Sequence, residues 1–244
     1  VQTALSSGLA VVLNVHHYEE LNNQPDAHRE RFLALWGQIA AHYREYPGIL
    51  AFELLNEPCR ELNDERWNAL AADAFAVVRA SNPKRIVIIG STQWNSVEKL
   101  GALRLPENDG RIIASFHYYK PMQLTHQGAE WVDGSDRWRG TTWTGTPAQL
   151  AALRADLDGV AAWAASNGVP LYLGEFGVYM TADMTSRVCW TASVAREAER
   201  RGMAWAYWEF CSGFGVYNPI ENTWRTPLRE ALQPSRPPIP EHRK

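Results

Sequence analysis

The chain has 244 residues and a hydrophobic fraction of 45%, which is enough to bury one sizeable core and favours a single domain. The formal net charge is −3, and no basic stripe alternates with aromatic residues, which argues against a nucleic-acid partner. No apolar run reaches the roughly 18 residues of a membrane span, so no membrane partner is expected. The first ten residues show no signal-peptide pattern, and the sequence assigns no localisation.

Short apolar segments alternate along the chain with segments of helical periodicity. The segments expected to be strands are 9–15, 49–55, 85–90, 112–117, 170–175 and 203–209. Apolar residues recur at helical spacing within 32–43, 67–78, 150–164, 184–201 and 227–232, and residues 1–8 resemble the end of a helix. Nearly continuous apolar strands are typical of a parallel sheet that is buried on both faces. The alternation therefore predicts βαβ units with right-handed crossovers.

Either an open, doubly wound sheet or a closed barrel would fit this alternation. No glycine-rich phosphate loop follows any predicted strand, which disfavours a nucleotide-binding sheet. Polar and aromatic residues follow almost every strand instead, and the strand ends of a TIM barrel converge on one active-site face. We therefore expect an α/β fold, an incomplete (β/α)8 TIM barrel with about six of the eight βα units visible and two N-terminal units missing. Residues 1–233 are assigned to this catalytic barrel and 234–244 to a Pro-rich tail.

Two glutamates stand where strands of this barrel should end. Glu57, in Asn56-Glu57-Pro58, follows the segment ILAFELL, and Glu175 ends the segment PLYLGE. Glycosidic cleavage needs two carboxylic groups, one that protonates the leaving oxygen and one that attacks the anomeric carbon or activates water. Retention of configuration requires carboxyl groups roughly 5–5.5 Å apart. Taken as a pair, the two glutamates predict a retaining glycoside hydrolase with Glu57 as acid/base and Glu175 as nucleophile.

Further polar and aromatic residues lie at the same strand ends or in nearby loops. His117 and Tyr119 are two positions apart, which places both on one face of a strand. His117 is a candidate to bind substrate or orient a glutamate, and Tyr119 to hold the nucleophile through its hydroxyl. The aromatic candidates for sugar stacking are Trp208 beside the cleaved bond, and Trp94 and Trp131 in loops, where ordinary packing is an equally good interpretation.

The pair His16-His17 ends the first predicted strand and leaves two interpretations open. Both histidines are expected to contact sugar or a carboxylate. The alternative is a metal-dependent barrel hydrolase built on these histidines together with Glu57, His117 and Glu175. The sequence contains no HExxH motif and no lysine at a strand end to bridge two metals. We therefore expect no metal and no other cofactor.

The segments NVHH, LLNEP, SFHYY, GEFG and AYWEF occur in this order over about residues 1–233. In this order they resemble glycoside hydrolase family 5, the cellulase family, and are most similar to thermophilic-type endoglucanases that also accept mannan. The resemblance implies a (β/α)8 fold, a retaining mechanism without metal, and β-1,4-glucan or mannan as substrate. It also implies that Asn56 binds the sugar 2-hydroxyl, and that His16, His17, His117, Tyr119 and Trp208 surround the reacting sugar. An arginine that steadies the nucleophile in this family would lie in the missing units.

Two expectations follow for the chain as it stands. It is expected to be an endo-β-1,4-glucanase, the alternatives being the metal-dependent hydrolase and an inactive, carbohydrate-binding remnant of a barrel. The predicted strands 9–15 and 203–209 would be unprotected sheet edges. If these residues are the whole polypeptide, a homo-oligomer is therefore expected.

Overall fold

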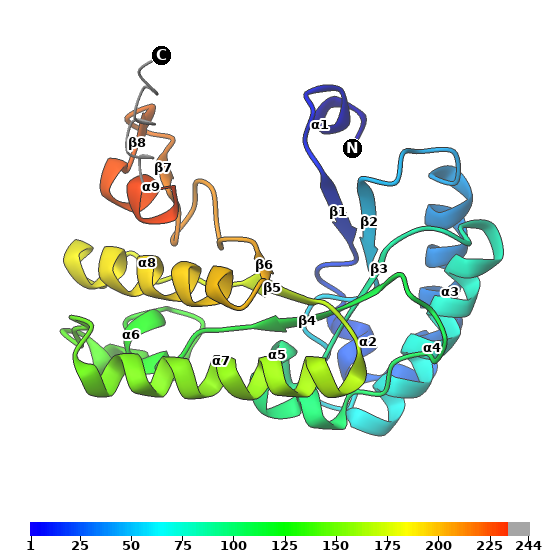
Figure 1. Cartoon of the computed structure of the whole chain (residues 1–244), viewed down its shortest axis with the longest axis horizontal. Coiled ribbons are helices and arrows are strands. Elements are labelled where there is room, and N and C mark those ends of the chain that lie inside the picture. The colour runs from blue at the N-terminus through cyan, green and yellow to red at the C-terminus, as the bar shows by residue number, and fades with distance from the viewer. Residues whose placement is uncertain (234–244) are drawn as a thin grey trace, which may run out of the picture. The chain divides into compact units, whose positions relative to one another are not determined.

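A computed structural model describes residues 1–233, so the predicted tail 234–244 lies outside the described residues. The chain divides into two compact units. Unit 1 consists of Val1–His117 and Gly159–Leu173, and unit 2 consists of Tyr118–Asp158 and the residues from Gly174 onward. The elements carry the labels of Figure 1.

Six strands follow one another in a single sheet in chain order, β1-β2-β3-β4-β5-β6. Their bounds are Val11–Asn14, Leu50–Glu53, Val87–Gly90, Ile112–His117, Leu171–Glu175 and Ala204–Trp205. The pairings from β1 to β4 are parallel. Next to β4, the Ala114 amide donates to the Pro170 carbonyl and the Tyr118 amide donates to the Glu175 carbonyl. Parallel strands in chain order, separated by helices, are the topology of a (β/α)8 barrel, and six of its strands are described here.

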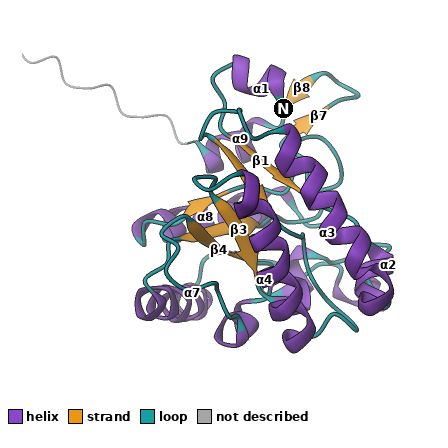
Figure 2. Ribbon diagram, turned by 90° about the vertical axis from the view of Figure 1, so that its right-hand side faces the viewer, coloured by secondary structure: helices purple, strands orange, loops and turns teal. Residues whose placement is uncertain are grey.

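The two long helices of unit 1 lie over the predicted helical segments 32–43 and 67–78, whereas the short helical elements at 19–23, 92–95 and 97–102 were not predicted. Its helical elements are α1 (Gln2–Ser6), α2 (Glu19–Asn23), α3 (Pro25–His42), α4 (Asp64–Ser81), α5 (Thr92–Asn95) and the 3-10 helix η1 (Val97–Ala102). Helix α3 begins with Pro25 in its first turn, where no helical hydrogen bond needs the amide that proline lacks. Further along, the helix buries Phe32 and Trp36. Asn63 caps the start of α4, and its side chain accepts from the Arg66 amide. Figure 2 shows α3 and α4 side by side, in agreement with their contacts.

Unit 2 carries the remaining helices and a small hairpin. Its helices are α6 (Met122–Thr125), η2 (Ser135–Trp138), α8 (Met184–Arg200) and α9 (Thr226–Leu232), while α7 (Pro147–Asn167) runs from unit 2 into unit 1. Asp183 caps α8 by accepting from the Ser186 amide. Within this helix Trp190 is fully buried and its indole donates to the Lys120 carbonyl.

The structure differs from the sequence expectation at the sixth strand and in the segment after it. The strand predicted over 203–209 is only Ala204–Trp205, so Trp208 follows the strand instead of ending it. The Glu209 carboxylate accepts from the amides of Cys211, Ser212 and Phe214, and the chain turns at these residues. The antiparallel pair β7 (Tyr217–Asn218) and β8 (Thr223–Trp224) was not predicted, because two-residue strands are too short to show alternation.

Among residues 1–233, no helix combines the length and the apolar character that a membrane crossing requires.

Candidate active site

Glu57 lies just beyond the carboxyl end of β2, in a segment held tightly to its neighbours. All four residues of β2 are buried, and the Asn56 amide donates to the Val15 carbonyl over 2.9 Å. Glu57 then takes a left-handed backbone conformation with φ 52°, which is uncommon for a residue with a Cβ. Its side chain remains 27% exposed. The glutamate is therefore rigidly supported by the strand and still open to solvent.

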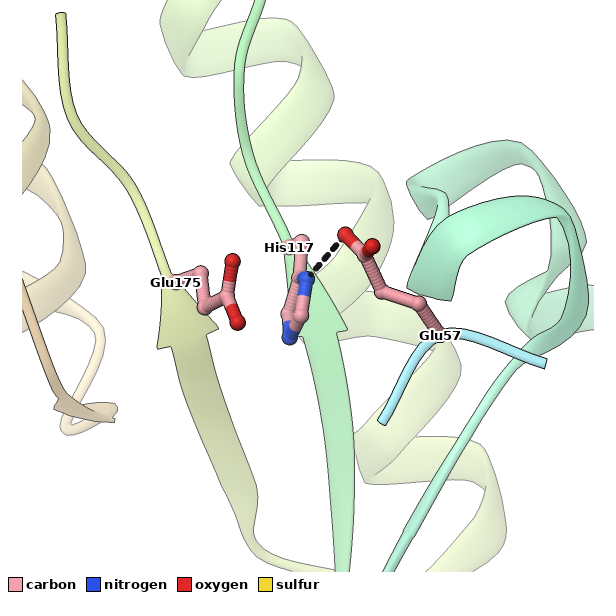
Figure 3. Close-up of side chains that lie close together, drawn as sticks. All are labelled: Glu57, His117 and Glu175. Carbon is pink, nitrogen blue, oxygen red and sulfur yellow. Dashed lines mark hydrogen bonds and ion pairs between the residues drawn. The ribbon is translucent and has the colours of Figure 1, made fainter. Parts of the chain in front are cut away.

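His117 ends β4 and touches polar atoms through both ring nitrogens. Its Nδ1 lies 2.9 Å from Oε1 of Glu57, and its Nε2 lies 3.1 Å from Nδ2 of Asn95. Figure 3 shows the contact with Glu57 as a dashed line. Only 2% of the His117 side chain is exposed, so water does not compete with these contacts. His117 therefore contacts Glu57, as one of the two interpretations of the sequence requires.

A buried carboxyl group interacts electrostatically with both His117 and Glu57. Glu53 is the last residue of β2, and its Oε2 accepts from Nδ2 of Asn14 over 3.1 Å. Burial raises the pKa of Glu53, while the nearby His117 acts in the opposite direction. A carboxyl group in this environment favours its neutral form. Sequence reasoning missed Glu53, although a charge within the apolar segment ILAFELL, four residues before Glu57, could have indicated it.

His16 and His17 lie next to each other after β1, with ring centroids 4.6 Å apart. His16 is partly buried and His17 is exposed. Burial, and then the adjacent His17, lower the pKa of His16, against the opposite effect of Glu57. The neutral ring is therefore favoured near Glu57 and His117, where it can donate and accept hydrogen bonds.

In unit 2, Glu175 ends β5 and is paired with a tyrosine. The Tyr119 hydroxyl donates to Oε2 of Glu175 over 2.9 Å. Glu175 is buried, and Figure 3 shows its side chain leaving the end of β5. Tyr119 therefore contacts the carboxylate through its hydroxyl, the contact expected from its position two residues after His117.

An aromatic cluster surrounds Tyr119 in the same unit. Its members are Tyr119, His126, Trp131, Tyr179 and Phe214. Trp131 meets Tyr179 edge to face at 4.9 Å, yet 59% of its surface is exposed. Trp208 also packs against this cluster. Flat, partly exposed rings on a rigid support suit stacking on apolar sugar faces, and His126, Tyr179 and Phe214 are supporting members that the sequence did not single out.

The remaining candidate residues occupy different environments. Trp94 is 52% exposed in α5, with φ 58°. Asn56 is buried beside Glu57. Both ring nitrogens of His117 already face protein atoms, so the metal-ligand role considered for this histidine would require breaking one of these contacts.

Comparisons with known proteins give matches over most of the chain. The profile of the cellulase family, glycosyl hydrolase family 5, matches residues 1–213. Among solved structures, Cel5A of Thermotoga maritima in complex with cellobiose is 48% identical, with a TM-score of 0.93 over 95% of this chain and 75% of that chain. A mannotriose complex of the same enzyme gives the same values. These similarities confirm the predicted incomplete (β/α)8 barrel.

Curated relatives are longer proteins. Endoglucanase H of Acetivibrio thermocellus is 34% identical over 238 residues, which are 95% of this chain and 25% of that protein. The cellulase/esterase CelE of the same organism is 28% identical over 90% of this chain and 28% of its own length. The chain thus spans about a quarter of the length of these two relatives. With a profile match over most of its residues, the chain belongs to glycosyl hydrolase family 5, the cellulase family.

Proposed function

We propose that the chain is a retaining endo-β-1,4-glucanase that uses Glu57 as acid/base and Glu175 as nucleophile. The observation that carries the proposal is the difference between the partners of the two carboxylates. Glu57 is partly exposed and accepts from an imidazole, whereas Glu175 is buried and accepts from a phenol. A buried, hydrogen-bonded carboxylate suits attack on carbon, and a more accessible one suits proton exchange with an alcohol or with water.

The reaction would proceed in two displacements. In the first, Glu175 attacks the anomeric carbon while Glu57 gives its proton to the leaving glycosidic oxygen, which forms a covalent glycosyl-enzyme and releases a shortened chain. In the second, Glu57 removes a proton from water, the water oxygen bonds to the anomeric carbon, and Glu175 leaves. Tyr119 would orient the nucleophile in both steps through its hydrogen bond to Oε2.

The other candidate residues would bind the sugar chain. We assign Asn56 to the 2-hydroxyl of the reacting sugar and His16 and His17 to polar contacts beside it. Trp94, Trp131 and Trp208 would stack on sugar faces, because each ring is exposed or partly exposed.

The proposed substrates are β-1,4-linked glucans, including cellulose and mixed-linkage β-glucan, with mannans as a second class. Glucans are supported by relatives described as endoglucanases and by the cellobiose complex of the Thermotoga enzyme. Mannans are supported by the mannotriose complex of that enzyme.

The first test is the release of new reducing ends from soluble mixed-linkage β-glucan and from β-1,4-mannan, with and without a chelator. We expect activity that is resistant to the chelator and lost in Glu175→Gln. Loss of activity on chelation would favour the metal-dependent hydrolase, and sugar binding without cleavage would favour the inactive remnant.

The second test concerns stereochemistry. Proton NMR of freshly released product should show the β-anomer first, and a crystal structure should place the Glu57 and Glu175 carboxyl groups roughly 5–5.5 Å apart. An α-anomer, or a separation of about 6.5–9.5 Å, would mean inversion instead.

A further inference from the structure

The short element α5 after β3, which forms a loop with non-helical backbone angles, holds a buried asparagine in an unusual conformation. Gln93, Trp94 and Asn95 have φ values of 51°, 58° and 54° in succession. The left-handed region is unfavourable for residues with a Cβ, and such residues gather at functional sites. Asn95 is fully buried. Its conformation places the amide against Nε2 of His117, 22 positions further along the chain.

Hydrogen bonds hold this loop in place on both sides of Asn95. The Ser91 hydroxyl donates to the Ser96 carbonyl over 2.8 Å. Asp64, at the start of α4, accepts from the Thr92 hydroxyl and, over 2.8 Å, from Nζ of Lys99. These bonds connect the loop to a long helix, so the Asn95 side chain has little freedom to move away from His117.

Gly90, the last residue of β3, leaves room for the Asn95 side chain. A Cβ added at Gly90 would lie 2.3 Å from Oδ1 and 2.7 Å from Nδ2 of Asn95. The φ angle of Gly90 is not among the positive values of the chain, so its backbone conformation suits any residue. The lack of a side chain at this position therefore serves the approach of the amide.

The contacts of the His117 ring with Glu57 and with Asn95 together favour one protonation state. Oε1 of an ionised Glu57 can only accept, so the Nδ1 atom of His117 carries a proton and donates it. The Nδ2 atom of Asn95 can only donate, so Nε2 of His117 carries no proton and accepts. The reversed amide orientation would turn Oδ1 of Asn95 toward Nε2 and would require a doubly protonated, cationic ring.

We propose that Asn95 is a positioning residue that holds His117 in the neutral form protonated on Nδ1. In this form His117 donates a hydrogen bond to Oε1 of Glu57 without adding a positive charge beside it. Oε1 is thereby occupied, and the catalytic proton of Glu57 resides on Oε2. The proposal rests on the acid/base role proposed for Glu57, but the state of the ring can be measured whether or not the chain cleaves glucan.

Other titratable groups near the ring belong to neighbouring strands of unit 1. Glu53 on β2 and His16 after β1 both interact electrostatically with His117. Neither is altered in the variants below, and Glu175 and Tyr119 of unit 2 are also unchanged. Differences among the variants therefore report on Asn95.

The direct test is a long-range nitrogen–proton NMR spectrum of the full chain with labelled histidine, in which the His117 signals are assigned by their loss in His117→Gln. In the wild type we expect the Nδ1-protonated neutral pattern at neutral pH. Asn95→Asp replaces the donor by a carboxylate and should produce the doubly protonated pattern. Asn95→Gly, which tolerates the left-handed backbone, should produce a mixture of the two neutral tautomers.

The kinetic test uses the basic limb of the pH–rate profile on mixed-linkage β-glucan. In Asn95→Asp a cationic His117 favours ionised Glu57, so the limb should move to lower pH by about one unit. In Asn95→Gly the carboxylate loses part of its hydrogen-bond donor, so the limb should move the other way. A purely structural role would not shift the limb in opposite directions.

Two further variants complete the design. Asn108→Asp is a matched control, because Asn108 is an exposed asparagine with φ 59° in the same unit. The basic limb of the pH–rate profile of this variant should coincide with that of the wild type. Gly90→Ala should shift the basic limb of the pH–rate profile in the same direction as Asn95→Gly. In the Asn95→Gly background it should cause little further shift, because the side-chain amide that the added methyl group would contact is then absent.

A wild-type His117 that is cationic or protonated only on Nε2 at neutral pH would overturn the proposal. So would shifts of the same sign in Asn95→Asp and Asn95→Gly, or an equal shift in Asn108→Asp. Absence of glucan cleavage combined with the expected NMR patterns would instead contradict the proposed function and leave the role of Asn95 intact.

Discussion

Glu57 and Glu175 differ in hydrogen-bond donor, the first accepting from His117 and the second from Tyr119. Their amide variants should therefore fail at different steps. Glu175→Gln removes the nucleophile, and activity should fall at least about 1000-fold on every substrate. Glu57→Gln removes the proton donor, so an aryl glycoside with a good leaving group should still form a glycosyl-enzyme that mass spectrometry detects. Glycosylation of Glu175→Gln but not of Glu57→Gln would reverse the two roles.

The Tyr119 hydroxyl contributes one hydrogen bond to the proposed nucleophile. A hydrogen bond to a charged group is worth about 1.5–3 kcal/mol, so Tyr119→Phe should lower kcat/KM by about 10- to 100-fold while the ring keeps its place in the aromatic cluster. Tyr43→Phe, at the end of α3, serves as control and should change kcat/KM less than twofold. Initial rates on soluble β-glucan decide the matter, and equal rates for the two variants would contradict the assigned role.

Glu53 should make folding stability depend on pH. Burial raises its pKa in the folded chain above that of the unfolded chain, so its contribution is fully present at a pH below the unfolded value and is lost as pH rises toward the folded value. Glu53→Gln cannot ionise and keeps an oxygen for Asn14. Its free energy of unfolding in urea should therefore exceed that of the wild type by on the order of 1 kcal/mol at pH 7.5, with a smaller gain at pH 4.5. A gain that is equal at both pH values would argue against a neutral Glu53.

At the scale of the elements, Arg85 joins the end of α3 to the start of β2. This buried guanidinium donates to the carbonyls of Tyr43, Tyr46, Pro47 and Leu50. Removing it leaves four carbonyl acceptors without this donor, including that of the buried Leu50, and an unsatisfied buried acceptor costs about 1–3 kcal/mol.

Arg85→Ala should therefore lower the free energy of unfolding in urea by about 3 kcal/mol or more. The free energy of unfolding of Arg85→Lys should lie between those of the wild type and Arg85→Ala, because an ammonium group has fewer donors than the five of a guanidinium. Arg104→Ala at an exposed arginine should stay within about 0.5 kcal/mol of the wild type. A similar loss for Arg85→Ala and Arg104→Ala would show that the bonds of Arg85 are not needed.

At the scale of the whole molecule, a polypeptide of just these 244 residues is expected to self-associate. β1 is an outermost strand in the described sheet. Val12, on this strand, is 41% exposed, and Leu9, just before it, is 58% exposed. Unprotected apolar edge strands pair with other chains. Light scattering at micromolar concentration should show a mass above the 27.5 kDa of one chain.

Val12→Lys should reduce this association, because a lysine on an edge strand opposes pairing. Ala34→Lys adds the same charge on the exposed surface of α3 and should leave the association unchanged. An active wild-type chain that scatters as a monomer would refute the expectation.

The sequence by itself determined the order of strands and helices and the position of both glutamates. Apolar runs and helical stripes differ in periodicity, so five of the six strands lie where they were predicted to within two residues at either end. A polar residue that follows an apolar parallel strand must lie at the carboxyl edge of the sheet, which located Glu57 and Glu175. The sixth strand is shorter than predicted, Ala204–Trp205, and the chain beyond it turns where Glu209 accepts from three backbone amides.

Only the tertiary structure decided which side chains meet. It joined His117 to Glu57 and to Asn95, and Tyr119 to Glu175, across sequence separations of 60, 22 and 56 residues. It also placed a fully buried amide at Asn95 and a buried carboxyl group at Glu53. Local patterns report whether a residue lies on a strand or in a loop. A hydrogen bond between distant segments depends instead on loop conformations such as the left-handed run at 93–95 and on the space left by Gly90, which no periodicity encodes.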